Sequence, residues 1–160
     1  MITHAEVLEL YDYKNGQLFW KKSTNKKVKI GAKAGGDGIN SDGRKSISVN
    51  GKRYLASRVI FLHQNGYLPN MIDHINGIKT DNRIENLRPA TSVQNNQNAK
   101  IRKDNKSGFK GVSFKRNKWY VQLRIKGQKR SFGYYDDIEL ADLVAQEARD
   151  KYHNTFAKHK

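Results

Sequence analysis

The hydrophobic pattern of the N-terminal part of the chain predicts short elements separated by tight turns. Apolar positions within residues 5–10 predict a short helix. Asn15-Gly16 stands between two aromatic, alternating runs, which is typical of a β-hairpin with a two-residue turn. Residues 21–45 are rich in Lys and Gly, and they predict a loop or irregular strands.

A second hairpin and a helix follow along the chain. Alternating apolar positions flank Asn50-Gly51, and this pattern predicts the hairpin. Apolar residues at helical spacing predict a helix over 56–65, for which Asn65-Gly66 is a suitable C-terminal cap.

The middle of the chain combines short apolar runs with many polar residues. Residues 71–75 predict a strand, and an Asn-Gly pair turns the chain after it. A polar loop then leads to an extended stretch at 88–90. Thr91 or Ser92 can cap a helix over 93–100. The predicted order is therefore strand, loop, strand and helix.

The C-terminal third predicts a sheet packed against a helix. Residues 101–107 lack an apolar period and predict a basic linker. Three strands are predicted, at 108–115, 118–126 and 129–135. One face of the second strand is apolar and is formed by Trp119, Val121, Leu123 and Ile125. This face is expected to pack on a closing helix capped by Asp136 or Asp137, while the polar and basic face stays open.

These elements predict an α+β fold class with two domains. A central ββα unit is preceded by β-hairpins and followed by a three-stranded antiparallel sheet packed on one helix. The predicted boundaries are 1–100 for the first domain (hairpins in 1–55 and the ββα core in 56–100), 101–107 for the linker and 108–160 for the second domain.

The charge distribution favours a polyanionic partner. The chain has 160 residues, with 31 Lys and Arg against 15 Asp and Glu, and a formal net charge of +16. Residues 100–130 carry 12 basic residues and one acidic residue, whereas residues 71–99 carry three of each. Such an excess opposes compaction, and nucleic acid fits it better than an anionic membrane surface does. The neutral middle segment is therefore expected to have its own chemistry between two phosphate-binding regions.

The composition excludes several classes of protein and site. Cysteine is absent, which excludes disulfides and every Cys-based zinc site. No apolar run approaches the ~20 residues that span a bilayer, and no signal peptide is recognisable. We therefore expect no membrane association, no structural zinc, no small-molecule cofactor and a cytoplasmic location.

Four polar residues of the middle segment are candidates for hydrolytic chemistry. Hydrolysis of a phosphodiester needs a base for water, a cation for the charge on the phosphate, and a group that orients the base. Asp73-His74 offers a carboxylate beside an imidazole, on opposite faces unless the strand ends or twists there. Asn95 offers an oxygen suited to a hard divalent cation. Asn86 is the kind of amide that ties loop backbone together.

These residues resemble the HNH, or ββα-metal, nucleases, and among them the phage and intron homing endonucleases. The resemblance covers residues 72–98. It implies that His74 is the general base and that Asn86 braces the loop. It further implies that Asp73 and Asn95 bind one divalent cation, with Mg²⁺ preferred and Mn²⁺ as an alternative. These four residues form the predicted catalytic set.

Other histidines are interpreted structurally. A lone Asp-His pair is usually a turn feature, so the hypothesis depends on the ordered pattern and not on the pair. His63 lies on the predicted helix before the site, where a structural role is favoured over catalysis. His4, His153 and His159 are predicted to be surface residues. Ser57 stands where the family usually has a histidine, which weakens any role for the neighbouring Arg58.

Residues 108–160 resemble the plant APETALA/ethylene-response-factor DNA-binding domain, whose members read the major groove with three strands. The resemblance implies DNA contacts from Lys110, Lys115, Arg116, Gln122, Arg124 and Lys129. Ser113 and Ser131 also stand at matching positions, but they are too short to reach as far. Lysine in place of arginine keeps the charge and loses the bidentate fork. We therefore expect phosphate contacts to dominate the affinity.

The favoured hypothesis is a divalent-metal-dependent DNA endonuclease of the homing type. It would nick DNA or cut both strands, leave 5′-phosphate and 3′-hydroxyl ends, and act on double-stranded DNA as a monomer or weak dimer. Two alternatives stay open, a sequence-specific DNA-binding regulator with an inert nuclease centre and an RNA-binding protein. Cleavage of DNA would distinguish the endonuclease from the inert regulator. Competition by structured RNA would distinguish it from an RNA-binding protein.

Overall fold

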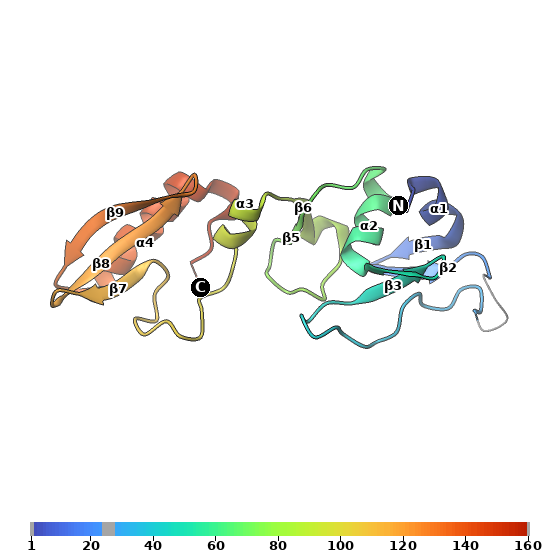
Figure 1. Ribbon diagram of the computed structural model, residues 1–160, viewed down its shortest axis with the longest axis horizontal. Coiled ribbons are helices and arrows are strands. Elements are labelled where there is room, and N and C mark those ends of the chain that lie inside the picture. Colours follow the sequence, from blue (N-terminus) through green and yellow to red (C-terminus); the bar gives the residue numbers. More distant parts are fainter. Residues whose placement is uncertain (1, 24–27, 160) are drawn as a thin grey trace. The chain divides into compact units, whose positions relative to one another are not determined.

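The chain combines helices with small antiparallel sheets in two compact units. The structure is a computed structural model that describes residues 2–23 and 28–159. The units are Met1–Ala90 and Thr91–Lys160, and each is described by itself (Figure 1). The described residues form four α-helices, three two-stranded sheets and one three-stranded sheet. The mixed α and β composition of the prediction is therefore confirmed.

The N-terminal unit contains the two predicted hairpins and the predicted helix after them. Its elements are α1 (His4–Leu10), β1 (Tyr11–Lys14), β2 (Gln17–Trp20), β3 (Ser46–Val49), β4 (Lys52–Leu55), α2 (Ala56–Asn65), β5 (Ile72–His74), the 3-10 helix η1 (Ile84–Asn86) and β6 (Leu87–Pro89). The hairpins turn at Asn15-Gly16 and Asn50-Gly51, where all four residues have positive φ. The helix α2 ends at Gly66 in the left-handed conformation, with φ 76°.

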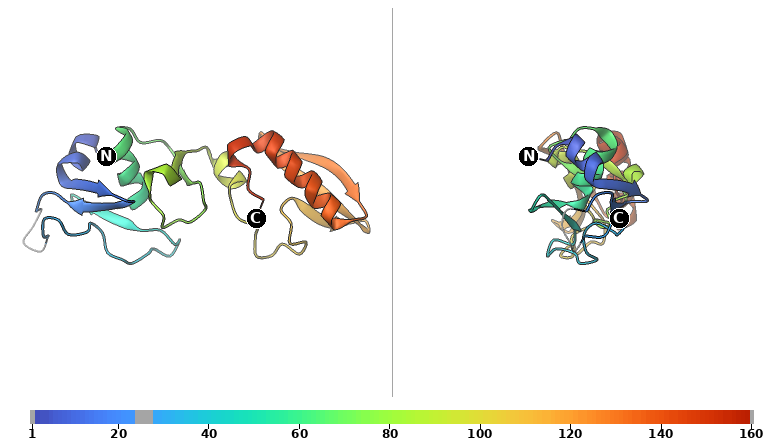
Figure 2. Two further views of the ribbon diagram at one scale, coloured as in Figure 1. Left: turned by 180° about the vertical axis from the view of Figure 1, so that it is seen from behind. Right: turned by 90° about the vertical axis from the view of Figure 1, so that its right-hand side faces the viewer.

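The core of this unit lies between the helices α1 and α2 and the two hairpins (Figures 1 and 2). Its fully buried residues include Val7, Tyr11, Leu18, Val59 and Ile60. The Tyr11 hydroxyl donates to the backbone oxygen of Ser48 (3.0 Å), and burial raises the pKa of Tyr11 to about 12. One hydrogen bond therefore joins the two hairpins inside the core.

The predicted irregular segment 21–45 contains no helix or strand among the residues that the structure describes, and its residues 24–27 lie outside them. A single isolated bridge pairs Phe19 with Lys33. Ala34 is buried in the core, so this segment is anchored to the first hairpin.

The strands β5 and β6 form a short antiparallel pair. Ile72 lies opposite Pro89, and His74 lies opposite Leu87. The loop between the strands contains η1, which the sequence did not predict. The predicted strand over 71–75 is shorter in the structure because the chain turns after His74.

The C-terminal unit is a three-stranded sheet with a long helix across one face (Figure 2). Its elements are α3 (Ser92–Gln97), β7 (Val112–Lys115), β8 (Lys118–Ile125), β9 (Gln128–Tyr135), α4 (Ile138–His153) and the 3-10 helix η2 (Asn154–Phe156). Asp137 caps α4 by accepting from the backbone N–H of Leu140 (2.6 Å). Val121, Ala141 and Ala145 are fully buried where α4 meets the sheet.

Two boundaries in this unit differ from the expected ones. The first strand begins at Val112 and not at residue 108, because Gly108 and Gly111 have left-handed φ values of 75° and 83°. The helix α3 has the predicted Thr91 cap, ends at Gln97, and belongs to the C-terminal unit although the first domain was predicted to reach residue 100. None of the helices in the described part of the chain has the length and apolarity that crossing a bilayer needs.

The two hairpin glycines provide a test of how the first hairpin supports the middle segment. Gly16 and Gly51 have the same φ of 76°, but a Cβ on Gly16 would lie 2.8 Å from the backbone nitrogen of Arg83, whereas nothing lies within 4 Å of one on Gly51. We expect Gly51→Ala to lower the free energy of unfolding by about 1–2 kcal/mol, the cost of the left-handed conformation alone. Gly16→Ala should cost about 2 kcal/mol more, because the Arg83 backbone must move. If denaturant titrations show the same loss of unfolding free energy for both variants, the close approach of Gly16 to the Arg83 backbone is contradicted.

Candidate functional site

The end of β5 places Asp73 and His74 in a buried polar environment. Asp73 is 4% exposed and His74 is 6% exposed. Asp73 lies opposite Arg88 in the strand pair, and the Arg88 guanidinium approaches Asp73 Oδ2 with Nε (3.0 Å) and Nη2 (2.9 Å). The buried carboxylate is therefore compensated by a charge-assisted contact with the neighbouring strand.

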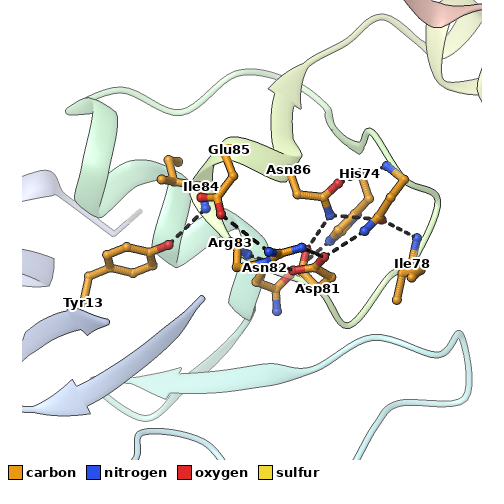
Figure 3. Close-up of polar contacts among 10 residues, drawn as sticks. Tyr13, His74, Ile78, Asp81, Asn82, Arg83, Ile84, Glu85 and Asn86 are labelled. Carbon is orange, nitrogen blue, oxygen red and sulfur yellow. Dashed lines mark hydrogen bonds and ion pairs between the residues drawn. The ribbon is translucent and has the colours of Figure 1, made fainter. Parts of the chain in front are cut away.

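His74 is oriented by a second buried residue. Asn82 is 3% exposed, and its Oδ1 lies 3.0 Å from His74 Nε2 (Figure 3). Because the amide oxygen can only accept, Nε2 carries the proton in this contact. The lone pair of the neutral imidazole is then on Nδ1, the nitrogen that can act as a base. Asn82 thus orients the ring and selects its tautomer.

The buried Asn86 closes the loop that follows His74. Its Oδ1 accepts from the backbone N–H of Asn76 (2.9 Å), and its Nδ2 donates to Asn76 Oδ1 (3.1 Å) and to the backbone oxygen of Asp81 (2.7 Å). Figure 3 shows hydrogen bonds that end at the Asn86 side-chain amide. One side chain therefore joins both ends of the loop 76–81.

A second polar network stiffens the same loop from outside. The Asp81 carboxylate accepts from Arg83 Nε (2.9 Å) and Nη2 (2.8 Å) and from Asn76 Nδ2 (2.7 Å). The hydrogen bonds from Arg83 hold the pKa of Asp81 well below its usual range, and Asp81 in turn raises the pKa of Arg83. These residues and Asn82 were predicted only as a polar loop, because the contacts depend on the turn geometry.

The first hairpin supports the site from the N-terminal side. The Tyr13 hydroxyl accepts from the backbone N–H of Ile84 (3.0 Å), at the start of η1 (Figure 3). Gly16 lies against the backbone of Asn82 and Arg83. Part of the N-terminal segment therefore fixes the position of the residue that orients His74.

The predicted ligand Asn95 lies on α3, which belongs to the C-terminal unit. It is half-buried and follows the Thr91–Gln94 capping box. The structure brings Asp73, His74 and Asn86 into one region of the N-terminal unit, and a shared metal between Asp73 and Asn95 stays a prediction.

The donor atoms suit a hard divalent cation. Asp73 and Asn95 would offer carboxylate and amide oxygens, and the chain has no cysteine. Among the residues that the structure describes, no three His, Asp or Glu side chains are grouped as a metal site. Mg²⁺ does not need such a group, because it keeps several waters and binds substrate phosphates with one or two carboxylates. The residues therefore fit Mg²⁺ better than zinc.

The structural contacts of His63 and His153 test two of the predictions for the other histidines. His63 is half-buried, and its Nε2 lies 3.0 Å from the backbone oxygen of Tyr11, which agrees with a structural role. His153 was predicted on the surface, and that prediction is wrong. It is 7% exposed, its Nε2 lies 3.2 Å from the backbone oxygen of Arg124, and burial lowers its pKa. The reason is that α4 extends to His153 and packs this end on β8.

The six residues predicted to contact DNA have different environments. Lys115, Arg124 and Lys129 are exposed, and Lys129 is the cross-strand partner of Arg124. Arg116 is exposed in the turn between β7 and β8, with φ 51°. Gln122 is half-buried. Lys110 is half-buried, and its ammonium is bonded to backbone oxygens of the same unit.

The open face of the sheet also carries an aromatic pair that the sequence analysis did not select. The rings of Tyr120 and Tyr134 are cross-strand partners with centroids 4.6 Å apart. Lys115 Nζ lies 4.8 Å from the centre of the Tyr120 ring, and Gln122 Nε2 donates to the Tyr120 hydroxyl (2.9 Å). The alternation in β8 had already placed Tyr120 on the polar face, which was the available signal. The face is thus basic and aromatic together.

Comparison with known proteins gives two matches. Residues 54–97 match the HNH endonuclease family. Protein 3.8 of Escherichia phage T7 is 33% identical over 98 residues, which span 59% of this chain and 80% of the phage protein. No solved structure is significantly similar. The family match contains all four residues of the predicted catalytic set.

The loop brace can be tested without any assay of activity. Asn86→Ala removes three part-buried hydrogen bonds of about 1 kcal/mol each, so we expect a loss of roughly 2–4 kcal/mol in the free energy of unfolding. Amide hydrogen exchange over residues 76–81 should accelerate as well. The control is Asn70→Ala, since Asn70 is exposed. Unchanged exchange in the loop would show that Asn86 does not brace it.

Proposed function

Because this chain belongs to the family of the phage Protein 3.8 and carries an HNH endonuclease segment, we propose that it is a divalent-metal-dependent DNA endonuclease of the homing type. The observation that supports this most directly is the buried pair at the end of β5. Asp73 is held by Arg88 and His74 by Asn82, within the segment that matches the family. A turn feature without function would not require two buried, separately oriented polar groups.

In this proposal His74 is the general base. Its Nδ1 takes a proton from the attacking water, whose oxygen forms a bond to phosphorus while the bond from phosphorus to the 3′ oxygen breaks. The leaving 3′ oxygen takes a proton from solvent, so the products carry 5′-phosphate and 3′-hydroxyl ends. Asn82 keeps the ring in the tautomer that this step needs.

Two residues are proposed to hold one divalent cation, with Mg²⁺ preferred over Mn²⁺. These are Asp73 and Asn95, through carboxylate and amide oxygens. When bound, the cation supplies charge stabilisation for the phosphate and the leaving oxygen. Arg88 orients the Asp73 carboxylate, which has acceptor positions for more than one partner.

The C-terminal sheet is proposed to bind double-stranded DNA with its open face. Support comes from the exposed Lys115, Arg124 and Lys129 on that face, and from the large basic excess of residues 100–130. Phosphate contacts of this kind give affinity that is largely independent of sequence. A monomer with one such site would nick one strand, and cutting both would need a dimer or two encounters.

His74 provides the direct test of the proposed function. With Mg²⁺, the wild-type chain should convert supercoiled plasmid to open circles, and EDTA should abolish the conversion. His74→Ala should lower the nicking rate by about 10²–10⁴-fold, the usual contribution of a general base. His4→Ala, on α1, is the matched histidine control and should nick at the wild-type rate.

Equal nicking by His74→Ala and the wild type would refute the role of His74. Sequence-specific binding without cleavage in either Mg²⁺ or Mn²⁺ would instead support the inert regulator.

The salt dependence of binding tests the open face of the sheet. Arg124→Ala and Lys129→Ala should each reduce the slope of log affinity against log salt by about 1, because each removes one phosphate contact. Lys151→Ala, which changes an exposed lysine on α4, should leave the slope unchanged. If all three variants reduce the slope equally, DNA does not lie on this face in particular.

A further inference from the structure

Lys110 differs from the exposed basic residues of the sheet in where its ammonium lies. Its Nζ donates to the backbone oxygens of Gln97 (2.7 Å) and Ala99 (2.6 Å), and the residue is half-buried. Lys115 and Lys129, by contrast, are exposed. The charge of Lys110 is therefore directed into its own unit and not toward solvent.

One of the two bonded oxygens belongs to Gln97, the last residue of α3, and the other belongs to Ala99, just after the cap residue Asn98. The last carbonyls of a helix have no partner within the helix, and the last turn of α3 carries no basic residue. A cation at this end is favoured by the helix dipole and can donate to the open carbonyls. Lys110 follows the helix in sequence and supplies both the positive charge and the hydrogen-bond donor. It therefore acts as a C-terminal cap of α3.

The backbone of Lys110 is fixed to the rest of the unit as well. Its carbonyl oxygen accepts a hydrogen bond from Nη1 of Arg149, a fully buried residue of α4. Arg149 Nη2 in turn lies 3.6 Å from Asp142 Oδ1. At the next position, a Cβ on Gly111 would lie 2.6 Å from Leu123 Cδ2, so the chain here lies directly against β8. The backbone that carries the Lys110 side chain is therefore held in place by α4 and β8.

The position of Lys110 also has an electrostatic cost. Burial, together with the charges of Arg149 and Lys158, lowers the pKa of Lys110 to about 8. A lysine that only contacted DNA phosphates would avoid this cost by staying in solvent. The cost is offset here by the two carbonyl contacts.

We propose that Lys110 is a positioning residue for α3, which it fixes on the C-terminal unit, and that it does not contact DNA. Because α3 carries Asn95, Lys110 would act on the reaction through the orientation of that proposed metal ligand. This consequence rests on the proposed nuclease function. It also replaces the role that the plant-domain resemblance implies for this position.

The test compares Lys110→Met with Lys115→Met in the full chain. Lys110→Met should lower the nicking rate by about 10–100-fold and raise the Mg²⁺ concentration at half-maximal rate, as expected when the support of a metal ligand is lost. Its salt slope of DNA binding should equal that of the wild type. Lys115→Met should reduce the slope by about 1 and leave the Mg²⁺ midpoint unchanged.

Two further measurements keep this inference testable if Lys110→Met is less stable. Lys110→Arg keeps a cation that can donate to both oxygens, so it should restore most of the nicking rate. Amide exchange at the end of α3 should accelerate in Lys110→Met and not in Lys115→Met. A salt slope lowered by about 1 in Lys110→Met, or an unchanged Mg²⁺ midpoint, would overturn the proposal. If the wild type does not nick, the nuclease proposal fails. The salt slope and the amide exchange then still test whether Lys110 caps α3 or contacts DNA.

Discussion

The antiparallel pairing of β5 with β6 is the constraint on which the candidate site depends. It covers only three residue pairs, yet it sets Asp73 opposite Arg88 and directs His74 to the other side of the strand. So short a pair cannot order the long polar loop that joins the strands. Asn86 provides the missing order, because its amide bonds to both ends of that loop. The imidazole has a fixed partner only because this loop has a fixed shape.

The charged residues of the two units have different proposed roles, in hydrolysis and in DNA binding. In the N-terminal unit, all three acidic residues of the middle segment lie in ion pairs, Asp73 with Arg88 and both Asp81 and Glu85 with Arg83. The acidic residues of this neutral segment therefore serve the local structure of the candidate site. In the C-terminal unit, residues 100–130 carry 12 basic residues and one acidic residue, and this excess of positive charge fits a polyanion. Affinity and hydrolysis would thus depend on different residues.

The sequence predicts elements well where local chemistry determines them. The two Asn-Gly hairpins and the Gly66 helix end follow from backbone preferences, and the structure contains them. The partners of the candidate site could not be predicted, because Asn82 meets His74 only through the shape of the loop. Lys110 shows the same limit, since its sequence pattern marks a basic strand entry and only packing reveals its contacts with α3.

We propose that one divalent cation, held by Asp73 and Asn95, shares a DNA phosphate with His74. Anomalous diffraction from crystals of His74→Ala protein bound to duplex DNA and Mn²⁺ tests it most directly. We expect one manganese peak that is coordinated by the Asp73 carboxylate, the Asn95 amide oxygen and a DNA phosphate oxygen. A phosphate-bound peak that contacts neither residue, or DNA bound with no metal near Asp73, would contradict it.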